Sequence, residues 1–413
     1  MAVAAVTMVT AWSTVWAQGS TCNPELIRSG GMGISTETPS GFHQFLSGGV
    51  LMRCRGESTE MEADSVAWFS DRQRMDFVGN VQFRDSTLTL DSDRASYYMR
   101  DERLEAFGNV RLENKETGSV LVGSRLTYLR AVSGVREATE MFAINRPTVE
   151  YRTETDLEAD PYVIVADRIR LRGDHASWAG GNVTIDRANF SASGDSSLLD
   201  VSAGEGFLIG GAQMAGRDSA SYKLVGRRID FRMIDNSVNW IQSRDSAVAT
   251  SADWKMLGDT IEFELDNDLI QRGSAWGTST RPQAVSAEQT ITADSLVIDT
   301  PDQILTEVRG IGNGHAMTQA DSVEASDWIA GDTVVASFGE QDTGRGLTRL
   351  AALGNAQSFF HIFEDSTGVG LPAINYARGR KITVLFHNGT LDRVDVMDGD
   401  GVYLEPPLRK PVP

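Results

Sequence analysis

The chain has 413 residues and carries 57 Asp and Glu against 38 Lys and Arg, a formal net charge of -19. A protein that binds nucleic acid needs a basic face to neutralise phosphates, so this charge argues against a nucleic-acid partner. Glycine is frequent, at 40 residues, and proline is sparse, at 11. Many turns between short apolar alternations predict an all-β chain, long enough for a large core or for several stacked units.

The first segment has the form of an export signal. It is apolar from Ala2 to Ala17 and ends in Val15-Trp16-Ala17, which is a small-residue cleavage site. About 16 apolar residues are few for a helix that spans a bilayer. Residues 1–17 are therefore predicted to be a secretory signal peptide, and the alternative is an uncleaved anchor. Residues 18–55 are expected to form an N-terminal segment of their own.

Two cysteines, Cys22 and Cys54, lie between the signal and the first repeat. In an oxidising compartment an even pair of cysteines is often a disulfide. The alternative is a pair of inert buried thiols, and the spacing does not decide between the two. Cys22 and Cys54 are therefore a candidate disulfide.

A repeated unit begins after these cysteines. The stretch FVGNVQF at Phe77–Phe83 returns as AFGNVRL at Ala106–Leu112. Gly-Asn occurs again at residues 181–182, 312–313 and 354–355. A second alternation, with the pattern small, polar, any, apolar, any, apolar, precedes the Gly-Asn strands. Neighbouring copies lie roughly 30 residues apart, which indicates a repeat architecture.

Apolar and polar residues alternate on both sides of each Gly-Asn. In the first copy Met75, Phe77, Val81 and Phe83 share one face of a strand. One apolar face and one solvated face per strand is typical of an antiparallel sheet. Glycine inside a strand marks a bend or bulge, and asparagine tolerates left-handed backbone angles. We predict that Gly-Asn bends the second strand of each unit, the alternative being a plain hairpin turn.

A family resemblance rests on the stretch ADSVAWFSDRQRMDFVGNVQFRDSTLTLDSDRASYYMRDERLEAFGNVRLENKETGSVLVGSRLTYL. It resembles the OstA-like (LptA-type) periplasmic lipopolysaccharide-transport family, clearly over Ala63–Leu129 and more weakly to Tyr403. The resemblance implies an elongated, twisted, open β-jellyroll of two facing antiparallel sheets. OstA-like repeats would fill residues 56–200, continue over 201–406 and leave a C-terminal tail at 407–413. It also implies a lengthwise apolar groove for acyl chains, and end-to-end strand pairing with other proteins of a bridge between two membranes.

The predicted lipid groove consists of the inward-facing apolar residues of these strands. Its members are Val66, Trp68, Phe77, Val81, Phe83, Tyr97, Leu112, Tyr128, Ile169, Leu171, Ile229, Phe231, Ile261, Phe263, Leu296 and Ile298. The alternative is a closed core in which these side chains pack on one another. The resemblance favours the groove, where each buried methylene of an acyl chain would contribute about 0.8 kcal/mol.

Charged residues follow the repeat as well. Basic clusters at residues 168–172, 227–232 and 378–381 offer guanidinium groups that suit lipid phosphates. The alternative, a solvated outer face that balances the acidic residues, is favoured. An Asp recurs at a matching place in several units, as at Asp64 and Asp93. Because it recurs, it fits a turn role better than catalysis.

The chain has none of the common catalytic or metal-binding motifs. The spacings H-E-x-x-H, C-x-x-C, G-x-S-x-G and the P-loop are absent from the sequence. We therefore expect no enzyme activity, no cofactor and no metal site. A polysaccharide-active β-solenoid enzyme would need a single, non-repeating acidic cluster on one outer face, and the sequence offers none.

The function that the resemblance implies is transport of a lipid. The expected protein is a periplasmic bridge, associated with the outer membrane, that carries lipopolysaccharide or lipooligosaccharide through an apolar groove. Its expected partners are that lipid, other bridge proteins and an outer-membrane barrel. The alternative is a structural or adhesive β-repeat protein of the cell envelope that transports no lipid.

Overall fold

The computed structural model describes most of the chain, namely residues 22–152, 160–173, 176–217, 222–234, 237–252, 254–286, 289–318, 326–342, 344–362 and 372–405. The predicted signal peptide, residues 1–17, and the predicted tail, residues 407–413, lie outside the described residues. The chain divides into two compact units, one of residues 1–147 and 170–174, the other of residues 148–169 and 175–413. The predicted division of the repeats at residue 200 stays a prediction.

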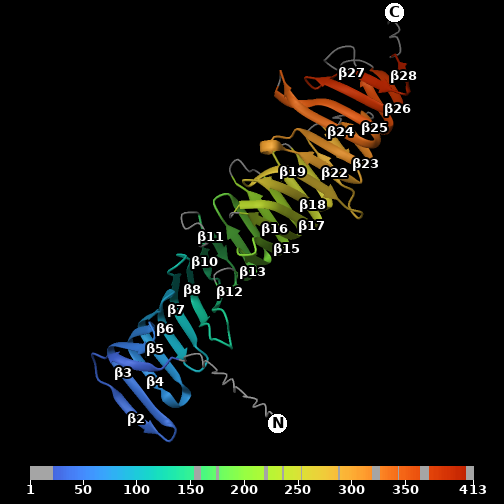
Figure 1. Ribbon diagram of the computed structural model, residues 1–413. Coiled ribbons are helices and arrows are strands. Elements are labelled where there is room, and N and C mark those ends of the chain that lie inside the picture. The colour runs from blue at the N-terminus through green and yellow to red at the C-terminus, as the bar shows by residue number, and fades with distance from the viewer. Residues whose placement is uncertain are drawn as a thin grey trace, which may run out of the picture. The chain divides into compact units, whose positions relative to one another are not determined.

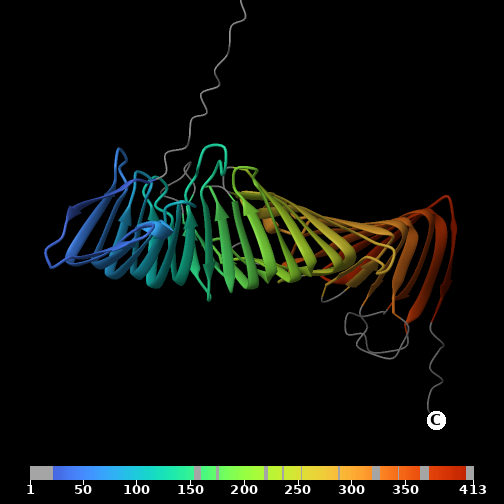
Figure 2. The same ribbon diagram turned by 90° about the horizontal axis from the view of Figure 1, so that it is seen from below.

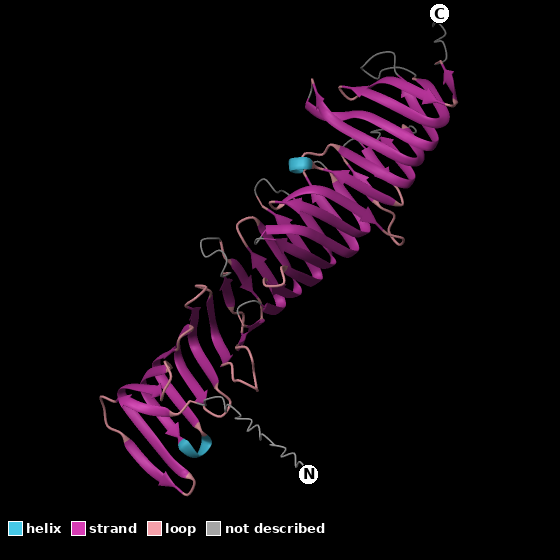
Figure 3. Ribbon diagram, viewed as in Figure 1, coloured by secondary structure: helices cyan, strands magenta, loops and turns pink. Residues whose placement is uncertain are grey.

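Strands make up 76% of the structure, which confirms the all-β prediction. The described residues contain no α-helix, only the two 3-10 turns η1 (Ser70–Arg72) and η2 (Pro301–Gln303) (Figures 1 and 3). The first unit holds β1 (Pro24–Arg28), β2 (Ile34–Thr38), β3 (Gly41–Cys54), β4 (Glu60–Phe69), β5 (Arg74–Arg84), β6 (Leu88–Tyr98), β7 (Arg103–Asn114), β8 (Val120–Leu129) and β9 (Glu140–Ile144). The N-terminal segment therefore adds three strands to the repeats.

The second unit begins with β10 (Thr148–Tyr151) and β11 (Tyr162–Val165), and β12 (Arg168–Arg172) carries residues of both units. Its remaining strands are β13 (Ala176–Asp186), β14 (Phe190–Asp200), β15 (Glu205–Gly216), β16 (Tyr222–Ile234), β17 (Ser237–Ser251), β18 (Lys255–Asp266), β19 (Leu269–Trp276), β20 (Gln283–Val285), β21 (Gln289–Thr292), β22 (Ser295–Asp299), β23 (Glu307–Thr318), β24 (Trp328–Gln341), β25 (Gly344–Ile362), β26 (Ala373–His387), β27 (Thr390–Met397) and β28 (Asp400–Leu404).

Strands that follow one another in the chain pair antiparallel. In the first unit β3 to β9 form one ladder in sequence order, and β1 and β2 pair with different halves of β3. In the second unit β13 to β19 do the same, followed by β22 to β26. Strands β27 and β28 pair with different halves of β26. Figure 2 shows this succession from green to red in the second unit.

Each Gly-Asn is a β-bulge inside a strand. Gly79 and Asn80 have φ angles of 80° and 47°, and the register of β5 against β4 shifts at this point. The same shift occurs at Gly108-Asn109 of β7. The predicted bend is therefore confirmed, and the hairpin alternative is wrong because the strand continues through the dipeptide. The bulge separates each long strand into two halves.

The two halves of the ladder face each other within a unit. Phe83 lies in the second half of β5, which pairs with the first half of β6. Tyr128 lies in the second half of β8, which pairs with the first half of β7. Because the strands alternate in direction, the two residues belong to different halves of the ladder. Their ring centroids are nevertheless only 6.0 Å apart. In the second unit Phe263 contacts Tyr222 in the same way, at 6.2 Å. Two facing layers therefore enclose an apolar interior in each unit.

Candidate functional site

The residues predicted to line the groove do face the interior of the units. Fourteen of the sixteen are buried, and two, Trp68 and Leu171, are half-buried. Those from Val66 to Tyr128 belong to the first unit, and those from Ile229 to Ile298 belong to the second. The period-two alternation therefore placed these side chains correctly, because each strand has one face turned toward the facing layer.

Side chains on the inner faces of the second unit pack closely against those of the paired strands. A methyl group on Gly206 would overlap the ring of Phe231, which lies across the neighbouring strand. A methyl group on Gly273 would lie 2.8 Å from both Phe263 and Ile298. Small residues thus make room for large ones, as in a close-packed core. Across the interior the ring of Phe263 contacts those of Tyr222 and Trp254, each at 6.2 Å between centroids. The inner faces of the second unit therefore pack on each other at this point, and an acyl chain would have to part them.

A carboxylate faces each Gly-Asn bulge. At all five Gly-Asn bulges of the described residues, the asparagine side chain donates a hydrogen bond to an aspartate that lies in another strand or directly before one. The pairs are Asn80–Asp64, Asn109–Asp93, Asn182–Asp167, Asn313–Asp294 and Asn355–Asp332, at 2.9 to 3.0 Å for the shorter bond of each pair. The recurring Asp therefore has a structural partner, and it pairs with the bulge rather than with a second carboxylate.

Asp259, which occupies the matching place in its own unit, binds backbone groups instead of an asparagine. Asp259 accepts hydrogen bonds from the backbone N–H groups of Thr278, Ser279 and Thr280, at 2.7 to 2.8 Å. The N–H of Ser279, followed by that of Thr280, lowers the pKa of the Asp259 carboxyl. Here the carboxylate orders the loop between β19 and β20, where the repeat is interrupted.

Both ends of the described chain present strands whose outer edges have no strand partner within the described residues. At one end β1 and β2 pair only with β3, and at the other β27 and β28 pair only with β26. All five residues of β28 are exposed, including Tyr403 and Leu404. Unpaired edges are templates for strand addition, and natural proteins usually protect them.

A family model described as OstA-like protein matches residues 52–144, which span the end of β3 to β9. This part of the chain belongs to the OstA-like family. The OstA-like segment carries the first two Gly-Asn bulges and half of the predicted groove residues. The family is related to lipopolysaccharide transport and is typically periplasmic. No curated protein matches the chain. Within the described residues no helix is long and apolar enough to cross a membrane.

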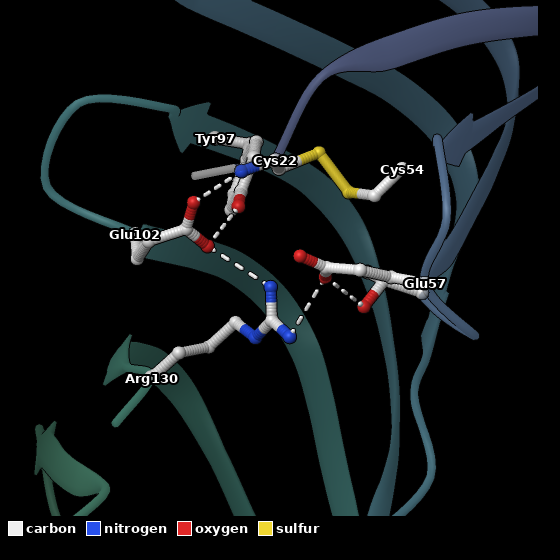
Figure 4. Close-up of a disulfide and its surroundings, with 7 residues drawn as sticks. Cys22, Cys54, Glu57, Tyr97, Glu102 and Arg130 are labelled. Atoms are coloured by element: carbon white, nitrogen blue, oxygen red, sulfur yellow. Dashed lines mark hydrogen bonds and ion pairs between the residues drawn. A yellow bond between two sulfur atoms is a disulfide. The ribbon is translucent and has the colours of Figure 1, made fainter. Parts of the chain in front are cut away.

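The OstA-like segment holds the N-terminal strand through a disulfide, which the sequence had left open. Cys22 and Cys54 are bonded, and both are buried (Figure 4). The backbone N–H of Cys22 donates to the Glu102 carboxylate at 2.6 Å. Cys22, two residues before β1, is therefore joined both to β3 by the disulfide and to the turn between β6 and β7 by the hydrogen bond.

Glu102 is the centre of a buried polar network. It accepts hydrogen bonds from the Tyr97 hydroxyl at 2.5 Å and from the Arg130 guanidinium at 3.0 Å, and Arg130 also binds Glu57 at 3.1 Å (Figure 4). Burial, and then the charge of Glu102, raises the pKa of Tyr97 above its ordinary value. Burial lowers the pKa of Arg130, but the charges of Tyr97 and the two glutamates outweigh it and raise that pKa. This network could not be predicted from the sequence, because its members lie in different strands and turns, namely Cys22, Glu57, Tyr97, Glu102 and Arg130.

The basic clusters lie on the outer faces, and each has at least one arginine paired with a carboxylate. Arg170 binds Glu140 at 3.1 Å, Arg228 binds Asp230 at 2.6 Å, and Arg378 binds Asp400 at 2.7 Å. This agrees with the solvated, charge-balanced alternative, not with a phosphate site. Within the described residues no group of three His, Cys, Asp or Glu side chains is close enough to hold a metal ion.

Proposed function

We propose that the protein is a periplasmic lipid carrier that passes lipopolysaccharide or lipooligosaccharide toward the outer membrane and performs no chemistry. The observation that carries this proposal is the OstA-like match at residues 52–144 on a ladder whose inner faces are mainly apolar. Acyl chains would replace protein contacts between the two facing layers of a unit. Since each methylene buried contributes about 0.8 kcal/mol, a lipid with several chains could offset the loss of those contacts.

The exposed edges support a place in a longer bridge. A second protein could add a strand to β27 and β28, or to β1 and β2, through backbone hydrogen bonds. The inner face of the partner would then continue the apolar interior. Export through the predicted signal peptide and an outer-membrane barrel as the final partner are part of the same proposal.

Site-specific crosslinking tests the interior. A photoreactive phenylalanine analogue replaces Phe231, which faces inward on β16, or Phe207, which faces outward on the paired strand β15 beneath Arg228. The probe is purified lipopolysaccharide added to the full chain. We expect crosslinked lipid at position 231 and none at position 207. Absence of crosslinked lipid at 231, or equal yields at both positions, would contradict transport through the interior.

A second candidate function is a structural or adhesive repeat protein of the cell envelope. The contacts of Phe263 with Tyr222 and Trp254 across the interior favour it, because a purely structural protein needs a closed core. It predicts that the protein purified from a periplasm carries no lipid. Native mass spectrometry of that material separates the two functions, since a bound lipid adds its own mass.

A further inference from the structure

A row of aromatic side chains crosses the outer face near the C-terminal end of the second unit. Trp328 of β24 lies directly opposite Phe359 of β25, and Phe359 lies directly opposite Tyr376 of β26. Their sequence neighbours Ile329, Phe360 and Ala377 are buried, so the three rings point outward. We call Trp328, Phe359 and Tyr376 the outer aromatic row.

In the outer aromatic row Tyr376 is exposed and Trp328 and Phe359 are half-buried, and the row continues in exposed apolar residues at both ends. Tyr376 is 37% exposed, while Met317 beside Trp328 and Val402 beside Tyr376 are 39% and 54% exposed. A contiguous apolar patch on an outer face usually marks a place of interaction. The patch is separate from the interior, because it occupies the opposite face of the same strands.

The rings of the row are held in place by their neighbours. His315 stacks on Trp328 with ring centroids 5.9 Å apart and planes 23° apart. His361 meets the ring of Phe359 edge-on at 5.1 Å, and its Nδ1 lies 2.7 Å from the Asp327 carboxylate. Both contacts restrict the side chains before any ligand arrives, which lowers the entropy lost on binding.

A polar cleft lies directly beside this row. Two positions along each strand from the aromatic row, a second row of residues lies on the same outer face. It consists of Gln357, Arg378 and Asp400, which lie opposite one another on β25, β26 and β28. They line a cleft of about 470 Å³ together with Asn355, Ala356, Gly379, Asp398 and Gly399. The cleft thus combines amide, carboxylate and guanidinium groups, which are planar donors and acceptors with fixed directions.

Aromatic rings beside such planar polar groups suit a sugar. A pyranose ring has an apolar face of C–H groups, which packs on an aromatic ring, and a rim of hydroxyl groups, which bind amides and carboxylates. The strands of a sheet are about 4.8 Å apart, so consecutive rings of the row could support consecutive parts of one extended chain. An acyl chain would leave the polar cleft unused.

We propose that the outer aromatic row and the polar cleft bind a saccharide chain, namely the sugar portion of the envelope glycolipid. This inference rests on the proposed function for the source of the sugar. The acyl chains would occupy the interior, while the sugars, which carry many hydroxyl groups, would lie on the outer face.

Calorimetric titration of the full chain tests the site without acyl chains. The probe is the lipid-free core oligosaccharide released from lipopolysaccharide by mild acid. Tyr376→Ala and Gln357→Ala should each weaken its binding by roughly tenfold, the value expected for one ring or one directed hydrogen bond. The matched control is Trp276→Ala, because Trp276 is 39% exposed on the outer face of β19, outside the patch. Circular dichroism verifies that every variant folds.

The outcomes separate this inference from the proposed function. No binding of the oligosaccharide, or an equal loss in Trp276→Ala, overturns the saccharide site, and lipid crosslinking at position 231 then decides the transport proposal alone. Binding of soluble peptidoglycan glycan strands without binding of the core oligosaccharide overturns the glycolipid as the source. Binding of the oligosaccharide at this patch without lipid crosslinking at position 231 supports the saccharide site and contradicts transport.

Discussion

Asp93 of β6 accepts two hydrogen bonds from the side-chain amide of Asn109 on β7, at 3.0 and 3.2 Å. Asn109 and its neighbour Gly108 both have positive φ angles, 44° and 74°, which L side chains other than asparagine rarely adopt. The carboxylate thus holds the bulge in a backbone conformation that would otherwise be unfavourable. Since the same pairing recurs along the chain, it fixes where each strand bends between the two facing layers.

Gly108→Ala should lower the free energy of unfolding of the first unit by roughly 1–3 kcal/mol. A Cβ at this position would overlap the Asp93 carboxylate and would also have to accept φ of 74°. Urea denaturation followed by circular dichroism measures the change. The control is Gly134→Ala, where φ is 75° but nothing lies within 4 Å of the added Cβ. Equal losses in both variants would show that the contact with Asp93 contributes nothing.

Glu102→Ala should destabilise the first unit by roughly 3 kcal/mol or more. The substitution leaves Arg130 and the Tyr97 hydroxyl buried without their common acceptor. Glu102→Gln keeps the shape and one acceptor oxygen, so it should cost less. The exposed control is Glu113→Ala, which removes only a surface pair with Arg111. A loss for Glu102→Ala as small as that for Glu113→Ala would mean that the network is not a stabilising element.

The double variant Cys22→Ala/Cys54→Ala should lose roughly 3–4 kcal/mol, because the bond closes a long loop in the unfolded chain. The two cysteines are 32 residues apart in sequence. Denaturation with and without reductant checks the cause. The wild-type protein should become as unstable as the variant once reductant is present, and the variant should not respond. A wild-type midpoint that reductant leaves unchanged would contradict a stabilising disulfide.

Local periodicity explains how much of the fold could be predicted. Phe77 and Phe263 were assigned to the interior correctly, because alternation alone determines the face of a strand. The bend at Gly79 was also predicted from local sequence, because apolar and polar residues keep the same alternation on both sides of Gly-Asn and a glycine inside a strand marks a bulge. These features depend only on residues close together in sequence.

Features that depend on register between strands could not be predicted in this way. The contact of Asp64 with Asn80 and the alignment of Trp328 with Phe359 require the pairing of two strands to be known. Whether Phe263 lines a groove or a packed core depends on the distance between the two layers, which alternation does not contain. The bond between Cys22 and Cys54 likewise follows from the position of β1 on β3.

Stability of the second unit should rise with pH up to about pH 6.5 because of His315. Burial, and then the nearby charge of Arg281, lowers the pKa of His315 below its ordinary value. The unfolded chain therefore binds more protons than the folded chain between the lowered pKa and the unfolded value of about 6.5, and stability increases with pH across that window. At a pH above this window the contribution of His315 to the stability of the folded chain is fully present. That contribution is lost as the pH falls through the window.

His315→Gln should flatten this pH dependence, because the variant has no group to protonate at that position. Urea midpoints of the second unit at pH 5.0 and pH 7.5, compared with the wild-type protein, measure the slope. The control is His387→Gln, since the side chain of His387 is 66% exposed on β26. An unchanged slope in His315→Gln, or an equal reduction in His387→Gln, would contradict the assignment of the pH dependence to His315.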